Sequence, residues 1–213
     1  METTSYNIGI IGSGAIGGIL GTYWAQAGHK VMFSSRNPEK LAKLVEKAGD
    51  NSQFGSVEEA TAFGDIILLA VNYSSIHQAI EKIKGFVTDK IIIDATNPLI
   101  KTDNGYKNMI PENTTAGEAM QRLLPDAKIM KSYTTLWSKY LETQSNKKDG
   151  LLVMPLSGGY KEDKQKVTQL IIDSGFHPYD LGGLSKSKLQ DPGSAIWNKP
   201  LVLQQFNEAI QTS

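Results

Sequence analysis

The sequence YNIGIIGSGAIG, residues 6–17, decides the fold. Its first half is a short apolar run of the kind that forms a buried parallel strand, and three glycines follow at the spacing GxGxxG. Apolar side chains after the loop recur at helical spacing: Ile19, Leu20, Tyr23 and Trp24. Strand, glycine loop and helix in this order predict a dinucleotide-binding Rossmann unit.

Each glycine of such a loop has a physical role. The first makes the tight turn, the second lets the backbone approach a pyrophosphate, and the third lets the helix pack closely on the strand. The free N–H groups of the helix N-terminus then face the phosphates. The alternative is a glycine-rich turn that only packs a helix on a sheet. We expect the loop to bind cofactor through Gly12, Ser13, Gly14, Ala15, Ile16 and Gly17.

The end of the second predicted strand, residues 29–33, indicates which dinucleotide binds. NAD-binding chains place a carboxylate there for the ribose 2′-hydroxyl, whereas a 2′-phosphate needs hydroxyls and cations. Beyond the start of this strand the chain has no acid until Glu39. An arginine fork and a lysine suit phosphate oxygens, so the sequence predicts NADPH. The residues expected at the 2′-phosphate are Ser34, Ser35, Arg36 and Lys40, although Arg36 and Lys40 also fit ordinary solvated surface.

The following 100 residues or so repeat strand and helix. Apolar runs at 65–71, 90–95 and 128–133 predict buried strands, and capping boxes at Ser56 and Thr115 predict helix starts. We also expect Asn37 to cap a helix that begins at Pro38. Ligands of doubly wound sheets bind beyond the carboxyl ends of the strands. That rule adds Val71, Asn72, Tyr73, Thr96, Asn97 and Pro98 to the expected cofactor site.

The rest of the chain continues the pattern less regularly. Apolar runs at 151–156 and 176–181, with a helix at 161–174 between them, predict an extension of the same sheet. The expected fold is α/β, a Rossmann doubly wound parallel sheet of about eight strands with a small C-terminal extension. We expect residues 1–135 to form the NADP-binding domain. Residues 136–213 are expected to extend the sheet, bind the acceptor and supply a dimer contact through a helical tail containing Trp197, Leu201, Phe206 and Ile210. The polar segment 101–114 predicts a loop near the site.

Composition excludes several classes of function. The 213 residues carry 22 basic and 22 acidic side chains and no cysteine. Zero net charge argues against nucleic-acid binding, and the absence of cysteine excludes disulfides, thiolate metal sites and cysteine nucleophiles. No metal site is expected. The uncharged run 3–28 lacks the basic start of a secretory signal and has too much glycine for a membrane helix. We therefore expect a cytoplasmic protein without membrane insertion.

Several motifs together resemble a known family, the NADPH-dependent deazaflavin (coenzyme F-420) reductases. The nucleotide-binding part is also similar to the cytosolic oxidoreductase domain of the STEAP ferric and cupric reductases. The resemblance covers nearly the whole chain. The motifs that carry it, besides the glycine loop, are Ala27–Val31, Ser35–Lys40, Ile92–Leu99, Asp191–Gly193 and Asn198–Leu201.

The family resemblance implies where the ligands lie. Ser35, Arg36 and Lys40 would hold the 2′-phosphate, and Asn72 and Asn97 would border the nicotinamide ribose. A flavin or deazaflavin would lie near Thr134 and the segment 181–189, and the chain would form a homodimer. The family usually has histidine or asparagine in place of Thr134, which leaves the identity of the acceptor open. The acceptor-site candidates are Tyr133, Thr134 and Trp137.

Three functions are compatible with these residues. The first is hydride transfer between NADP(H) and a flavin or deazaflavin, with ferric iron as an onward acceptor, and it needs no dedicated protein acid. The second is reduction of a small carbonyl or imine, which needs a proton donor at the nicotinamide; enzymes of that type usually carry a further helical domain. The third is a non-catalytic NADPH-binding module. The candidate proton donors, for each of which a structural role is at least as good an explanation, are His29, His77, His177, Lys131 and Tyr133.

Overall fold

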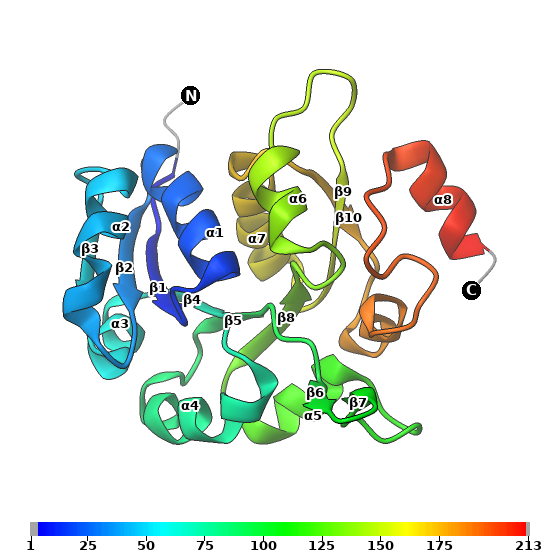
Figure 1. Cartoon of the computed structure of the whole chain (residues 1–213), viewed down its shortest axis with the longest axis horizontal. Coiled ribbons are helices and arrows are strands. Elements are labelled where there is room, and N and C mark those ends of the chain that lie inside the picture. Colours follow the sequence, from blue (N-terminus) through cyan, green and yellow to red (C-terminus); the bar gives the residue numbers. More distant parts are fainter. Residues whose placement is uncertain (1–3, 212–213) are drawn as a thin grey trace.

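The computed structural model, which describes residues 4–211, contains one eight-stranded sheet in the order β3-β2-β1-β4-β5-β8-β9-β10 (Figure 1). The predicted Rossmann sheet is thereby confirmed. The six strands from β3 to β8 are parallel, and β1 lies between β2 and β4, where a doubly wound sheet reverses its winding. The strands are β1 (Asn7–Ile11), β2 (Lys30–Ser34), β3 (Ser52–Gly55), β4 (Ile66–Leu69), β5 (Ile91–Asp94), β8 (Lys128–Ser132), β9 (Val153–Gly158) and β10 (His177–Asp180).

The last two strands depart from the expected parallel sheet. β9 runs antiparallel to β8, and β10 is parallel to β9. A parallel neighbour needs a connection that crosses the face of the sheet and returns to its starting edge. The only helix between β8 and β9 is the six-residue α6 (Ser138–Thr143), which packs on α1 (Ala15–Gln26). The chain therefore re-enters the sheet from the edge at which β8 ended.

Alternating side chains of the central strands bury against helices on both faces. Ile8, Ile10 and Leu68 belong to a core under α1, α2 (Ala42–Ala48), α6 and α7 (Lys161–Asp173). Ile67 and Leu69 belong to the opposite core, under α3 (Val57–Phe63), α4 (Ile76–Ile83) and α5 (Ala116–Leu123). The two helical layers lie above and below the sheet in Figure 1. Burial on both faces explains why these strands are continuously apolar.

Helix starts follow the sequence signals in two of three cases. The Ser56 and Thr115 hydroxyls accept the backbone N–H groups of Glu59 and Glu118, each at 3.1 Å, so both capping boxes are confirmed. The prediction for Asn37 and Pro38 is confirmed in part. A helical stretch begins at Pro38, as a 3₁₀ turn, Pro38–Leu41, that leads into α2, but the Asn37 side chain makes no cap hydrogen bond.

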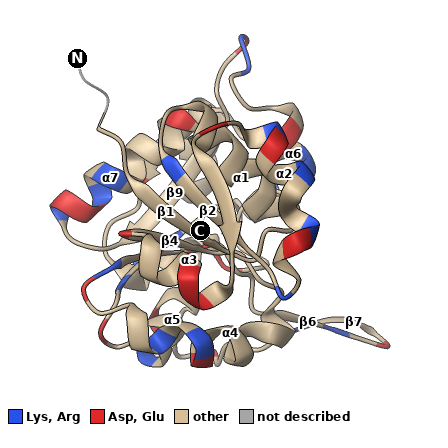
Figure 2. Cartoon of the chain, turned by 90° about the vertical axis from the view of Figure 1, so that its left-hand side faces the viewer, with Lys and Arg blue, Asp and Glu red and all other residues tan. Residues whose placement is uncertain are grey.

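Two further expectations about the chain are corrected. The segment 101–114 is not simply a loop, because β6 (Leu99–Thr102) and β7 (Gly105–Asn108) form an antiparallel hairpin. This hairpin projects from the body of the molecule (Figure 2). The helical tail is shorter than predicted: α8 (Leu203–Gln211) contains Phe206 and Ile210, whereas Trp197 and Leu201 precede it.

Charged residues of both signs are interspersed on the outer helices (Figure 2), in line with the formal net charge of zero. Among residues 4–211, no helix has the length and apolar character needed to cross a membrane.

Candidate functional site

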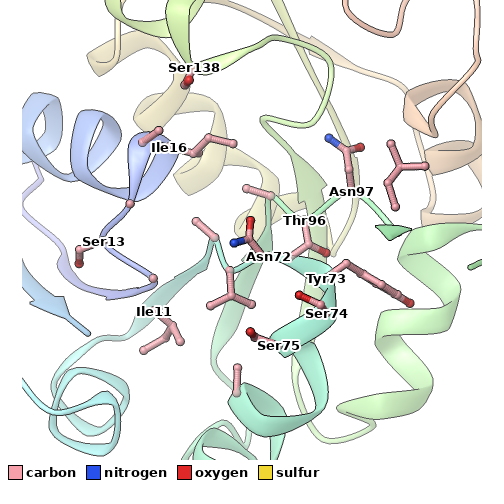
Figure 3. Close-up of a pocket in the computed structure, with 18 of the residues that line it drawn as sticks. Ile11, Ser13, Ile16, Asn72, Tyr73, Ser74, Ser75, Thr96, Asn97 and Ser138 are labelled. Carbon is pink, nitrogen blue, oxygen red and sulfur yellow. The ribbon is translucent and has the colours of Figure 1, made fainter. Parts of the chain in front are cut away.

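A cleft of about 1160 Å³ opens where the parallel strands end. It exceeds the ~300–1,000 Å³ typical of a pocket for one small ligand. The glycine loop after β1 forms one wall, and the turns after β4 and β5 form the floor (Figure 3). The β6–β7 hairpin, residues 136–139 and residues 197–198 form the outer part.

The three loop glycines differ in what a Cβ at each position would meet. Gly12 has φ +98°, and a Cβ there would lie 2.7 Å from the Ala70 carbonyl oxygen. A Cβ on Gly17 would lie 2.2 Å from the Gly12 carbonyl oxygen, so Gly17 permits close helix packing but does not line the cleft. A Cβ on Gly14 would meet no atom within 4 Å. Gly14 thus leaves open space at the N-terminus of α1, which fits a pyrophosphate held by backbone N–H groups.

Ser13 and Ser34 tie the glycine loop to β2. The Ser13 hydroxyl donates to the Ser34 carbonyl at 3.0 Å, and the Ser34 N–H donates to the Ser13 Oγ at 3.1 Å. Ser34 is fully buried, and its hydroxyl donates to the Ile10 carbonyl at 2.7 Å. The structure therefore gives Ser34 a structural role beneath the cleft, whereas Ser13 lies in the lining.

Ser35 and Arg36 lie at the end of the cleft where an adenine ribose is expected. The Ser35 Oγ accepts the Asn37 N–H at 3.0 Å, which leaves the Ser35 O–H available to a ligand. Arg36 is exposed and makes no ion pair with any carboxylate of residues 4–211. Lys40 is exposed but lies outside the lining. This donor set, without a carboxylate, suits a 2′-phosphate.

The turn after β5 is held by a buried ion pair. The Lys131 ammonium donates to the Asp94 Oδ2 at 2.8 Å and to the Thr96 carbonyl, and both charged side chains are 1% exposed. The Asp94 Oδ1 accepts the Thr96 N–H at 2.9 Å and the Thr96 hydroxyl at 2.7 Å. Asp94 and Lys131 therefore fix the backbone that presents Thr96 and Asn97 to the cleft.

Asn72 and Asn97 face the centre of the cleft from the turns after β4 and β5 (Figure 3). The Asn97 side-chain N–H₂ donates to the Thr134 carbonyl at 3.1 Å, while the Asn97 Oδ1 is buried and has no hydrogen-bond partner within residues 4–211. An unpaired buried acceptor is costly and fits a ligand donor such as a carboxamide N–H₂. Val71, Tyr73 and Thr96 also line the cleft, whereas Pro98 is buried outside it.

The three acceptor candidates have different surroundings. Tyr133 is fully buried at φ +59°, and its hydroxyl is 3.0 Å from the Ser174 Oγ. Its ring packs edge-on against Trp24 at 5.9 Å, away from the cleft, and burial raises its pKa. Thr134 is buried with an unpartnered hydroxyl, outside the lining. Trp137 is 62% exposed and lines the cleft.

None of the candidate proton donors proposed for a carbonyl reductase lines the cleft. His29 is buried and lies 2.9 Å from Asp173, and Lys131 is paired with Asp94. Within residues 4–211 the lining contains no histidine, aspartate or glutamate. Burial, and secondarily the charge of Asp94, raise the pKa of Tyr73, which makes this lining hydroxyl a weaker acid.

Several lining residues were not predicted. Ser74 and Ser75 lie in the 3₁₀ turn that precedes α4, and Gln78 lies in the first turn of α4. Extending the strand-end rule by one helical turn would have included them. Trp197 and Asn198 come from an irregular segment distant in sequence, and Tyr106 comes from the hairpin. Tyr106 belongs to the segment 101–114 that was expected near the site, whereas no periodicity in the sequence indicates that Trp197 and Asn198 reach the cleft.

Comparison with known proteins agrees with this geometry. Residues 7–98 match the family described as "NADP oxidoreductase coenzyme F420-dependent". Metalloreductase STEAP3 of Rattus norvegicus is 27% identical over 184 residues, which are 85% of this chain and 35% of that protein. The chain thus spans about a third of the length of this curated relative.

Two solved structures share the fold over nearly the whole chain. A hypothetical protein from Sinorhizobium meliloti has a TM-score of 0.79 at 27% identity, covering 94% of this chain and 96% of its own. A putative F420-dependent NADP reductase from Arthrobacter has a TM-score of 0.78 at 20% identity, covering 93% and 100%. The family match concerns residues 7–98, and the two solved structures show that the fold is shared over nearly the whole chain. The nucleotide-binding part of the chain resembles the coenzyme F420-dependent NADP oxidoreductases, as its motifs predicted.

Proposed function

We propose that the chain binds NADPH in this cleft and catalyses hydride transfer from it to a flavin or deazaflavin ring. Gly12–Ile16 would hold the pyrophosphate, Ser35 and Arg36 the 2′-phosphate, and Asn72 and Asn97 the nicotinamide end. Gly17 and Ser34 would support the loop from below. When bound, NADPH supplies the hydride, and the acceptor ring takes a proton from water.

The observation that carries this proposal is the chemistry of the lining. Transfer to a flavin-type ring requires only that two planar rings be held together, whereas carbonyl or imine reduction requires protonation of the product by a positioned acid. The described lining has no histidine or carboxylate, and its inner phenol, Tyr73, is a weakened acid. Its lysines, Lys82, Lys101 and Lys139, come from α4, the β6–β7 hairpin and α6, and not from the strand-end turns that would border the nicotinamide. The chain's own residues would therefore bind NADPH and the acceptor, orient the two rings and exclude water.

An acceptor screen tests the proposal. NADPH oxidation is measured with FMN, FAD, a deazaflavin, ferric citrate, and a panel of ketones and imines, in the unaltered chain and in Tyr73→Phe. We expect reduction of at least one flavin or deazaflavin, with kcat reduced less than about threefold by the substitution. Turnover of a ketone or imine that Tyr73→Phe abolishes would favour the carbonyl or imine reductase instead. Tight NADPH binding without turnover of any acceptor would favour a binding module.

A further inference from the structure

The N-terminus of α5 is capped by a segment that lies far away in the sequence. The first N–H groups of a helix have no partner inside the helix. Here the Gly117 N–H donates to the Ser187 Oγ at 3.1 Å, and the Ala116 N–H donates to the Asp191 carboxylate at 3.3 Å. Both acceptors belong to a 3₁₀ helix, Leu184–Gln190, and the residue after it. We call residues 184–191 the clasp.

The contact between the clasp and α5 depends on a glycine. A Cβ on Gly117 would lie 2.7 Å from the Leu184 Cδ1 and 2.7 Å from the Ser187 Oγ. Ser187 is fully buried, and Asp191 is only 4% exposed. A buried carboxylate at the positive end of a helix makes a charge-assisted hydrogen bond, which is stronger than a neutral one. Asp191 therefore holds the clasp on α5.

The clasp is also tied to the sheet beside the cleft. The Gln190 side chain donates to the Lys131 carbonyl at 3.3 Å and to the Ser157 Oγ at 2.8 Å, which joins it to β8 and β9. Burial raises the pKa of Asp191, while its hydrogen bond to Ala116 and the charge of Lys131 oppose that rise. The clasp thus adjoins the lysine that fixes the turn after β5.

Two consecutive turns lead from the clasp to the outer part of the cleft. The Ser194 N–H donates to the Asp191 carbonyl at 3.1 Å, and the Trp197 N–H donates to the Ser194 carbonyl at 3.2 Å. Ile196 is buried in a small core packed on α8, and Trp197 and Asn198 line the cleft. A displacement of Asp191 would therefore be passed along the backbone to this part of the cleft wall.

We infer that Asp191 is a positioning residue, which holds the clasp on α5 and thereby fixes Trp197 and Asn198 where the electron acceptor enters the cleft. This inference rests on the proposed function, in which NADPH occupies the strand-end turns and leaves the outer part to the acceptor. Asp191 lies outside the cleft lining, so it acts through the backbone of residues 192–198. Loosening the clasp should weaken acceptor binding more than it weakens NADPH binding.

Tryptophan emission provides a readout that does not depend on activity. The chain has three tryptophans. Trp24 is 0% exposed and Trp137 is 62% exposed, whereas Trp197 is half-buried. In a Trp137→Phe background, the emission that acrylamide can quench therefore comes from Trp197. The acrylamide quenching constant then measures how closely residues 191–198 hold Trp197 in the cleft wall.

Four variants separate positioning from general destabilisation. Asp191→Ala removes the acceptor of the Ala116 N–H, while Asp191→Asn retains an oxygen for it. Gly117→Ala pushes the clasp away without altering Asp191, and alanine does not weaken α5 because it forms helices better than glycine. Asp163→Ala is the matched control. Asp163 is 5% exposed, accepts the Tyr160 N–H at the start of α7 at 3.3 Å, and lies outside the cleft lining.

We expect Asp191→Ala and Gly117→Ala each to raise the quenching constant at least about twofold. In chains that retain Trp137, the same substitutions should raise the KM for FMN about fivefold and change kcat and the NADPH dissociation constant less than about twofold. If FMN is not reduced, the deazaflavin of the acceptor screen takes its place. Asp191→Asn should restore most of both losses, and Asp163→Ala should cause neither.

Three results would overturn the inference. The first is a quenching constant that Asp191→Ala and Gly117→Ala leave unchanged, and the second is an equal rise in Asp163→Ala. The third is a raised quenching constant with an unchanged KM for the acceptor, because the wall that moved would then not contact it. If the unaltered chain reduces neither FMN nor the deazaflavin, the proposed function fails, and the quenching constants still decide whether Asp191 positions Trp197.

Discussion

Replacing Lys131 by Met tests the buried ion pair beneath the cleft. The methionine fills much of the space of the lysine stem but removes the ammonium that lies 2.8 Å from the Asp94 Oδ2. Both side chains of the pair are 1% exposed, so the variant leaves a carboxylate buried without its counter-ion. Breaking one side of such a pair costs about 3–5 kcal/mol. For a chain of this size we expect the melting temperature to fall by roughly 6–20 °C.

A double variant distinguishes loss of charge pairing from loss of packing. Asp94→Asn retains an oxygen that can accept from the Thr96 N–H and hydroxyl, and combined with Lys131→Met it leaves no buried charge in the pair. We expect the double variant to cost about 1–2 kcal/mol, which is less than either single variant.

Urea unfolding followed by tryptophan fluorescence measures all three variants, and NADPH titration of the folded proteins reports on the Thr96–Asn97 turn. A cost below about 1 kcal/mol for Lys131→Met would refute the reasoning. So would a double variant whose cost equals the sum of the two single costs, because the pair would then not be coupled.

The remaining predictions concern the glycine loop and a buried carboxylate. The added methyl group of Gly14→Ala would meet open space, so we expect NADPH to bind at least tenfold more weakly while the free energy of unfolding changes by less than about 0.5 kcal/mol. Gly12→Ala should instead destabilise the fold by more than about 1 kcal/mol, because Gly12 has a positive φ and no room for a Cβ. If Gly12→Ala and Gly14→Ala changed the free energy of unfolding and the NADPH affinity equally, the separate roles of the two glycines would be contradicted. Burial raises the pKa of Asp191, so the folded chain holds this proton more tightly and loses stability as the pH rises above about 3.9. Asp191→Asn should therefore gain stability relative to the unaltered chain between pH 3.5 and pH 7 in urea unfolding. If the difference in unfolding free energy between Asp191→Asn and the unaltered chain stays constant with pH, the raised pKa of Asp191 does not contribute to stability.

The parallel central strands and one wall of the cleft could be predicted because each depends on local sequence. The glycine loop, the capping boxes and the continuously apolar strands are encoded by neighbouring residues. The rule that ligands lie beyond strand ends then brought Ser13, Asn72 and Asn97 into one cleft, as the structure has them. β3 was not identified, because its residues, Ser52–Gly55, contain no apolar run.

The outer cleft could not be predicted, because it is assembled from segments distant in sequence. The sequence predicts Trp197 only as part of a helical tail, and only the folded chain brings it to the site. Tyr133 illustrates the opposite error, a residue predicted at the site that lies in the core. It directly follows β8, but its positive φ turns its ring into the core between Trp24 and Ser174. Strand-end position alone does not determine toward which side such a residue points.

The central claim is that the cleft is built for NADPH and selects it through the 2′-phosphate. The most direct test compares the dissociation constants of NADPH and NADH for the unaltered chain and for Arg36→Asp, with Lys40→Gln alongside because Lys40 lies outside the lining. We predict that the unaltered chain binds NADPH at least 100-fold more tightly, about 2.7 kcal/mol, and that Arg36→Asp abolishes or reverses this preference. Similar affinities for the two dinucleotides in the unaltered chain would contradict the account.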